Sequence, residues 1–176
     1  VVKERELSAC LAGLKGNPSL VICDSQVVLK AAADTDASIP LTTFSILFSR
    51  LKGNLKVFVD SVKAIDELAD GDKVLIMEAC THHSTADDIG KFKIPRWIRQ
   101  YTGKNIEFEM NSGPYVGRDL SAYKLIISCG ACMINRKEML ARIESGKERN
   151  IPVTNYGIAI SYVQGVLSRV IKVFDL

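Results

Sequence analysis

The alternation of short apolar runs with helix-like stretches in the second half of the chain most constrains its fold. The runs KVLIMEA (73–79) and YKLIISC (123–129) each predict a buried strand. The stretch PRWIRQYTG (95–103) predicts a helix, because Pro95 suits a first helical turn and Gly103 suits the position after the last one. Strands that alternate with helices predict a parallel sheet with crossover helices on its faces.

The first half of the chain repeats this alternation over shorter segments. Residues 3–16 and 55–68 predict helices, and SLVICDS (19–25) predicts a strand. The stretch LTTFSILFSRLKG (41–53) is ambiguous between a strand and a helix. A single closing helix is expected over residues 157–174.

A polar, turn-like stretch, ADGD at residues 69–72, predicts a domain boundary. The sequence therefore predicts an α/β fold made of two small domains, residues 1–70 and residues 71–176. Each domain is expected to hold a mainly parallel sheet flanked by helices, in a Rossmann-like arrangement.

Charge and hydropathy exclude several classes of function. The chain has 23 basic and 20 acidic residues, a net charge of +3, and the two signs are mixed along its 176 residues. A nucleic-acid surface needs a clustered basic face, so we expect no nucleic-acid partner. The sequence has no apolar run long enough for a membrane span and no secretory signal pattern, so we expect no membrane association and a cytoplasmic location.

Three of the five cysteines and both histidines lie in two short stretches, CTHH (80–83) and CGAC (129–132). Each stretch follows a predicted strand, and the carboxyl ends of parallel strands meet at one edge of a sheet. We therefore expect Cys80 to lie near Cys129 and Cys132. Thiolates at C-x-x-C spacing bind zinc or an iron–sulfur cluster, or exchange disulfides. A 4Fe-4S cluster, a zinc site and a thioredoxin-like pair are the three alternatives.

Candidates for a fourth ligand follow Cys80 directly. His82 and His83 are adjacent and point in different directions in most backbones, so at most one is expected to bind a metal. Asp87 and Asp88 fit either a helix N-cap or a carboxylate ligand that iron would hold replaceably. His82 and Asp87 both remain candidates.

No catalytic residue is expected elsewhere in the chain. The sequence has no P-loop and no G-x-G-x-x-G, and no histidine outside residues 82–83 for a Ser/His/Asp arrangement. The two remaining cysteines, Cys10 and Cys23, are expected to pack as small apolar residues.

Four stretches of the sequence resemble the FeFe-hydrogenase maturation GTPase family (HydF), and together they cover nearly the whole chain. They are DSQVVLKAAADT with IPLTTFSILFSRLKGNL, GDKVLIMEACTHH with DDIGKFKIPRWIRQY, ISCGACMINRKEML, and IPVTNYGIAISYVQGVL. The resemblance implies a protein of three parts: a GTPase domain, a dimerisation domain and a cluster-binding domain. It implies homodimerisation through residues 1–70, by edge-to-edge pairing of sheets, and cluster binding in residues 71–176. GTP binding would belong to a domain outside these residues.

By motif, the resemblance assigns Cys80, Cys129 and Cys132 to the family's three cluster ligands. Ser128 stands where the family has a second histidine. Since a serine hydroxyl is a poor iron ligand, His82, Asp87, water or a group from a partner chain is left as the fourth ligand.

The resemblance also implies a role for the bound groups. This part of the protein would be a scaffold, not an enzyme. It would hold a 4Fe-4S cluster and a transient diiron precursor, which it delivers to the apo-FeFe-hydrogenase. Two radical-SAM maturases would supply the precursor.

Overall fold

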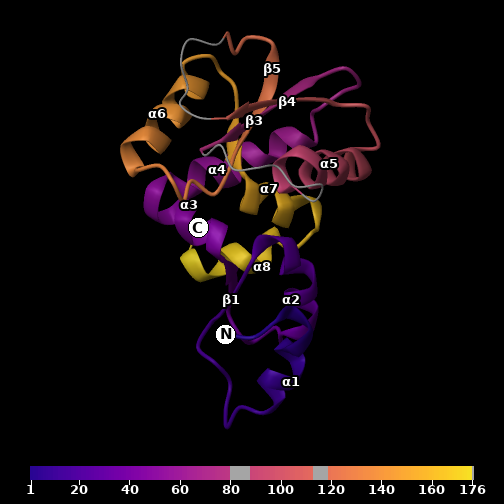
Figure 1. The fold of residues 1–176 in the computed structure, drawn as a ribbon, viewed down its shortest axis with the longest axis vertical. Helices are drawn as coiled ribbons and strands as arrows, with labels where there is room; N and C mark the ends of the chain where they lie inside the picture. The colour runs from indigo at the N-terminus through magenta and orange to yellow at the C-terminus, as the bar shows by residue number, and fades with distance from the viewer. Residues whose placement is uncertain (80–87, 113–118, 176) are drawn as a thin grey trace.

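The computed structural model describes residues 1–79, 88–112 and 119–175. A two-stranded sheet pairs β1 (Val21–Cys23) with β2 (Leu41–Thr43), and a four-stranded sheet has the order β4-β3-β5-β6. Figure 1 shows the larger sheet at one end of the molecule and α1, α2 and β1 at the other, with α8 between them. All paired strands run parallel, which confirms the predicted α/β fold with two parallel sheets.

The four-stranded sheet is built around two central strands. Its strands are β3 (Lys73–Glu78), β4 (Glu107–Ser112), β5 (Tyr123–Ser128) and β6 (Val153–Asn155). The chain runs from β3 to β4 at one side and then back across to β5, so the direction of winding reverses between β3 and β5. In open parallel sheets, this reversal point leaves a crevice at the carboxyl ends of the strands, where ligands bind.

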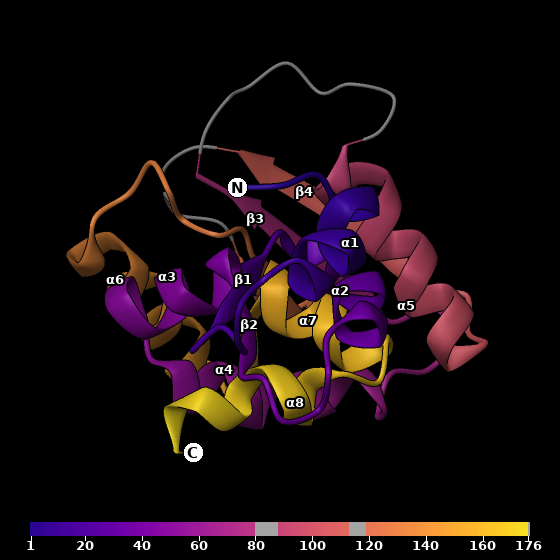
Figure 2. The same cartoon turned by 90° about the horizontal axis from the view of Figure 1, so that it is seen from below.

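Thirteen helical segments of the described residues surround the sheets. They are η1 (Glu4–Glu6), α1 (Leu7–Ala12), η2 (Ser25–Val27), α2 (Val28–Asp34), α3 (Phe44–Lys52), α4 (Leu55–Ser61), η3 (Val62–Ile65), the π-helix η4 (Ile89–Lys93), α5 (Ile94–Thr102), α6 (Arg136–Lys147), α7 (Tyr156–Val163), α8 (Leu167–Ile171) and η5 (Lys172–Phe174). In both views α5 and α6 lie on opposite sides of the molecule (Figures 1 and 2).

Polar side chains cap the start of four α-helices, α3, α4, α6 and α7. Thr43, Asn54, Asn135 and Asn155 each accept a hydrogen bond from a backbone N–H of the first turn of α3, α4, α6 and α7, respectively. Such caps stabilise a helix start by about 1 kcal/mol because they satisfy an amide that has no partner within the helix. The Thr43 cap also resolves the ambiguous stretch 41–53, which is a strand up to its cap and a helix after it.

One predicted helix is divided in two. The prediction of a single closing helix over residues 157–174 was wrong. The chain forms α7 and α8 instead, because Gly165 between them takes a left-handed conformation with φ of 72°. Only glycine adopts this conformation without a steric penalty, so the chain turns there. The turn brings α8 against β2.

The domain boundary near residue 70 stays a prediction. Helix α4 and segment η3, which precede this position, pack against β6 and β5 of the larger sheet. The Thr154 hydroxyl donates to the Phe58 carbonyl at 2.9 Å, and both residues are fully buried. None of the helices in the described part of the chain is both long and apolar enough to span a membrane.

Candidate metal centre

Cys129 lies where the central strands β3 and β5 end side by side. Its backbone N–H donates to the Met77 carbonyl at 2.8 Å, and the backbone N–H of Ala79 donates to its Sγ at 3.2 Å. The sulfur is therefore directed at the end of β3, at the point where the winding of the sheet reverses. The next residue in the sequence after Ala79 is Cys80, which lies outside the described residues.

The C-x-x-C loop makes a tight left-handed turn. Ala131 has a φ of 59° and is 2% exposed, so its methyl group is buried while its backbone carries strain of order 1 kcal/mol. On either side of this turn, Cys129 is half-buried and Cys132 is exposed. The loop thus presents one shielded and one open sulfur close together in the chain.

An ammonium group from the first half of the chain contacts this loop. The Lys52 Nζ, at the end of α3, donates to the carbonyls of Ala131 at 2.8 Å, Cys132 at 3.1 Å and Ile134 at 2.9 Å. It also lies 5.3 Å from the centre of the Phe48 ring. No motif in the sequence indicated this contact, since the partners are about eighty positions apart.

A buried carboxyl lies beneath the strand ends. Glu78, the last residue of β3, is 8% exposed and accepts a hydrogen bond from the Tyr156 hydroxyl at 3.2 Å. Burial, and next the charge of Glu78, raise the pKa of the Tyr156 phenol far above its ordinary value, so Tyr156 keeps its proton and donates. Gly90 makes room for this pair, because a Cβ there would come within 2.1 Å of the Tyr156 Oη. In the sequence, the signal for Glu78 was that an acidic residue directly follows the apolar run at residues 74–77.

The other predicted site residues have different outcomes. Cys80, His82 and Asp87 lie outside the described residues, so their assignment stays a prediction. Asp88 caps η4 by accepting from the Lys91 backbone N–H at 2.8 Å, which confirms the capping alternative for Asp88. Ser128 is fully buried within β5.

The remaining cysteines differ from each other. Cys23 packs against the core as expected, and burial, with a smaller contribution from Asp24, raises the pKa of its thiol to about 11. Cys10 is exposed, so the expectation that it packs as a core residue was wrong. The reason is that α1 buries none of its residues in this chain.

The thiols of the loop fit a soft metal or an iron–sulfur cluster by donor type and spacing. The N–H that Ala79 donates to Cys129 is of the kind that stabilises a metal-bound thiolate and tunes the potential of a cluster. Within residues 1–79, 88–112 and 119–175, no group of three or more Cys, His, Asp or Glu side chains is arranged to hold a metal ion.

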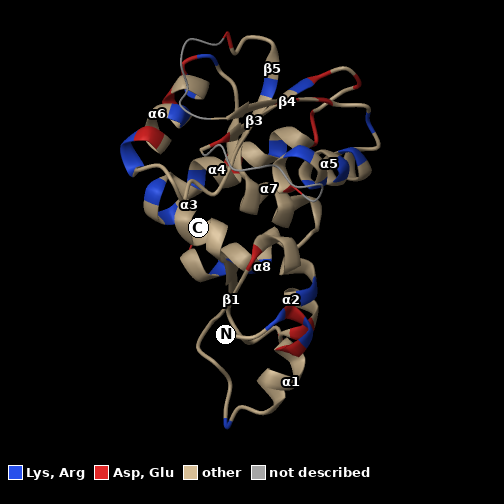
Figure 3. Cartoon of the chain, in the orientation of Figure 1, with Lys and Arg blue, Asp and Glu red and all other residues tan. Residues whose placement is uncertain are grey.

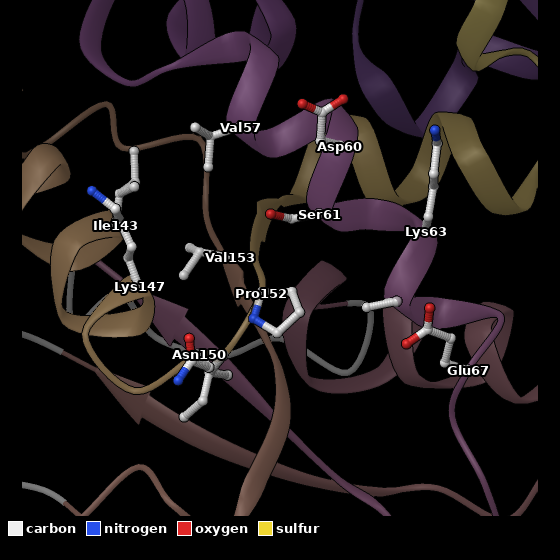
Figure 4. A pocket seen from close by; sticks show the side chains of 12 residues that line it. Val57, Asp60, Ser61, Lys63, Glu67, Ile143, Lys147, Asn150, Pro152 and Val153 are labelled. Atoms are coloured by element: carbon white, nitrogen blue, oxygen red, sulfur yellow. The ribbon is translucent and has the colours of Figure 1, made fainter.

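A surface cleft lies away from the cysteines. It has a volume of about 640 Å³ and runs between α4 and α6, with Val57, Ile143 and Pro152 among its apolar lining (Figure 4). Asp60 and Lys147 at its rim carry opposite charges. Because it adjoins the segment that enters β6, it is at the amino ends of the strands and is separate from the candidate metal centre.

Two family models match adjacent parts of the chain. Residues 56–173 match the Hydrogen maturase F tetramerization domain, and residues 1–53 match the Hydrogen maturase F dimerization domain. The chain belongs to the hydrogen maturase F family. This confirms the resemblance to HydF, and it identifies a hydrogenase maturation protein with domains for self-association. No curated protein matches the chain.

Proposed function

We propose that this HydF chain binds a 4Fe-4S cluster through Cys80, Cys129 and Cys132 and acts as a scaffold for hydrogenase maturation. It holds a diiron precursor as cargo and hands it to the apo-FeFe-hydrogenase, after two radical-SAM maturases have supplied it. The chain itself performs no catalysis in this proposal. Self-association through the region matched by the dimerization model gives the scaffold two copies of the site.

The observation that carries this proposal is the hydrogen bond between the Ala79 N–H and the Cys129 Sγ. It joins the end of β3 to the C-x-x-C loop, and Cys80 is the residue that follows Ala79 in the sequence. Three thiolates from two adjacent strand ends match the ligands that a cubane cluster needs. Membership of a hydrogenase maturation family favours this cluster over other thiolate-bound metals.

Cys129 and Cys132 have different roles in this proposal, because one is shielded and the other is at the surface. Cys129, shielded and hydrogen-bonded, would hold one iron firmly, while the exposed Cys132 would hold another at the surface. When bound, the cluster supplies an iron whose fourth ligand, His82 or Asp87 or water, can be exchanged for a ligand of the cargo. A carboxylate oxygen on iron is readily replaced, which suits delivery.

The test is anaerobic reconstitution of the chain with iron and sulfide. We expect a brown protein whose dithionite-reduced form gives the EPR signal of a reduced cubane, with a line shape that changes on adding imidazole or cyanide. Cys129→Ala and Cys80→Ala should each abolish the signal. Cys10→Ala is the matched control, since this exposed thiol lies in α1 and its loss should leave the signal unchanged.

A thiol–disulfide oxidoreductase is the second candidate, favoured by the pairing of a shielded Cys129 with an exposed Cys132 on one loop. It requires both of these thiols and not Cys80. Disulfide reductase activity that survives Cys80→Ala, together with no cluster after reconstitution, would replace the scaffold proposal.

A structural zinc site is the remaining alternative from the sequence. It predicts that a chelator unfolds the chain. The four-stranded sheet already has a buried core of its own, which includes Val74, Leu75, Ile126 and Ile127. We therefore expect circular dichroism to show a fold that survives chelation.

A further inference from the structure

Lys52 uses its whole donor capacity on the C-x-x-C loop. An ammonium group has three N–H donors, and the structure gives the Lys52 Nζ three carbonyl acceptors, those of Ala131, Cys132 and Ile134, at 2.8 to 3.1 Å. Three carbonyl oxygens that converge on one point repel each other unless a cation lies between them. The loop geometry and the ammonium group therefore depend on each other.

The loop needs such a restraint because its backbone is strained. Ala131 occupies the left-handed region, with φ of 59°, which a residue with a side chain keeps only when its surroundings enforce it. Two of the carbonyls that Lys52 binds belong to Ala131 and Cys132, so its hydrogen bonds act directly on the strained turn. Without them the turn between Cys129 and Cys132 is free to relax.

A second cation repeats this contact in the opposite direction. The Arg136 Nη1, at the start of α6, donates to the carbonyls of Leu51 and Gly53 at 3.0 Å each. These carbonyls lie at the end of α3, where the helix leaves them without partners and partly negative. Figure 3 shows the basic segments of α3 and α6 next to each other. The end of α3 and the loop are thus bound to each other from both sides.

We propose that Lys52 is a positioning residue that holds the Cys129–Cys132 loop in its ligand-binding turn. Lys52 lies in the region that matches the dimerization domain, and the loop lies in the region that matches the tetramerization domain. Its three hydrogen bonds link the first region to the backbone of the loop that carries Cys129 and Cys132 in the second. The part of this inference that concerns cluster binding rests on the proposed function. The part that concerns the loop does not.

The first experiment uses the metal-free, reduced chain and compares Lys52→Met with Lys56→Met. Methionine keeps the length of the apolar stem and removes only the ammonium group. Lys56 is the matched control, because its substitution removes the same charge from a nearby helix, where Lys56 pairs with Asp60 at the surface. Alkylation of each cysteine by a small reagent is followed by peptide mass spectrometry, with the exposed Cys132 as the internal reference for the half-buried Cys129.

Loss of the ammonium group should open the loop. We expect the alkylation rate of Cys129 relative to Cys132 to rise about tenfold or more in Lys52→Met, since charge-assisted hydrogen bonds of this kind contribute more than neutral ones. Hydrogen exchange of the backbone amides in residues 129–135 should rise in parallel. Both quantities should be unchanged in Lys56→Met. Equal rates in the two variants would overturn the proposal.

Lys52→Arg separates positioning from general stabilisation. Arginine keeps the charge and can donate to more than one carbonyl, so we expect it to restore part of the Cys129 protection. Thermal unfolding of all three variants shows whether the whole fold has changed. A Lys52→Met chain that unfolds, or one whose loss of protection extends evenly over the whole sheet, would assign Lys52 a global role and overturn the local one.

The reconstituted chain gives a spectroscopic readout. We expect Lys52→Met to take up a cluster with a broadened or shifted EPR line shape, which Lys52→Arg partly reverses, while Lys56→Met matches the unmodified chain. An unmodified chain that takes up no cluster at all contradicts the proposed function, yet the alkylation and exchange results would still test the role of Lys52. The two proposals can therefore fail separately.

Discussion

The two regions matched by the family models differ in how completely they bury their own sheets. In the second region, the central strands β3 and β5 are buried on both faces, except for Lys73 at the start of β3 and Lys124 in β5. In the first region, β1 and β2 have three residues each: β2 is buried, but β1 is only partly buried with Ile22 40% exposed, and α1 has no buried residue. A two-stranded sheet is marginal by itself. The second region therefore supplies its own core, while the first depends on what it packs against.

Part of that support comes from within the chain. Arg169 on α8 donates to the carbonyls of Ala32, Thr35 and Asp36 at the end of α2. This repeats the pattern of Lys52 and the C-x-x-C loop, in which a cation from one region binds a group of carbonyls in the other. Cations on converging carbonyls are a recurrent link between the two regions, and the rest of the support for the first region is expected from a second copy.

The largest expected difference between the two regions is in iron binding, and cysteine substitutions test it. We expect Cys132→Ala to lose nearly all of the iron that the reconstituted chain binds, because the ligand set falls from three thiolates to two. Cys23→Ala, in the first region, should keep the full iron content. Iron analysis and visible absorption measure both. Retained iron in Cys132→Ala would move the site away from the loop.

Truncating a core side chain in the larger sheet should lower the free energy of unfolding more than truncating a side chain of the small sheet. Leu75 is fully buried in β3, so Leu75→Ala is expected to lower the free energy of unfolding by about 3 kcal/mol, through lost burial and the cavity left behind. Ile22→Ala should lower it by less than about 1 kcal/mol, because Ile22 is already 40% exposed in the isolated chain and loses less buried area. Urea denaturation at low protein concentration measures both. Equal losses would remove the distinction between the two regions.

A substitution at the edge of β1 away from β2 tests whether a second copy of the chain pairs there. Val21 donates its N–H to Pro40 beside β2, and backbone direction alternates along a strand, so the N–H of Ile22 faces the free edge. Ile22→Pro removes this donor and leaves the β1–β2 pairing intact. We expect the dimer to dissociate about tenfold more readily, as the bond is lost once from each copy. Sedimentation measures it, with Ile22→Val as the control, and an unchanged dimer would place the interface elsewhere.

The smallest effect concerns pH and the thiol of Cys23. Its pKa is raised from 9.0 to about 11 by burial and by Asp24, so the folded chain favours the neutral thiol. The resulting stabilisation is complete below about pH 9 and is lost as the pH rises toward about 11. Because Cys23 is only half-buried, screening keeps the effect below about 1 kcal/mol. Between these pH values, denaturation of Cys23→Ala should show a smaller loss of stability than the unmodified chain. An identical pH dependence in the two chains would contradict this role for the Cys23 thiol.

Local patterns in the sequence determined most of the elements. Apolar runs marked β3 and β5, and the C-x-x-C pair was correctly placed after a strand. Gly103 ends α5 as expected, and Pro95 lies in its first turn, although the helix begins at Ile94 and follows η4 directly. The prediction was wrong over residues 157–174 because a single glycine, Gly165, looked tolerable inside a long helical pattern. A left-handed glycine is a backbone choice that periodicity does not record.

Only the tertiary structure decided which of these elements meet. The order β4-β3-β5-β6 makes β3 and β5 neighbours and so brings the Ala79 N–H to the Cys129 Sγ. It also brings Lys52 to carbonyls about eighty positions away in the chain. Such contacts depend on how helices and sheets pack, and packing is set by the summed burial of the whole core rather than by any short stretch. The sequence therefore determined which groups this protein carries, and the fold decided which of them act together.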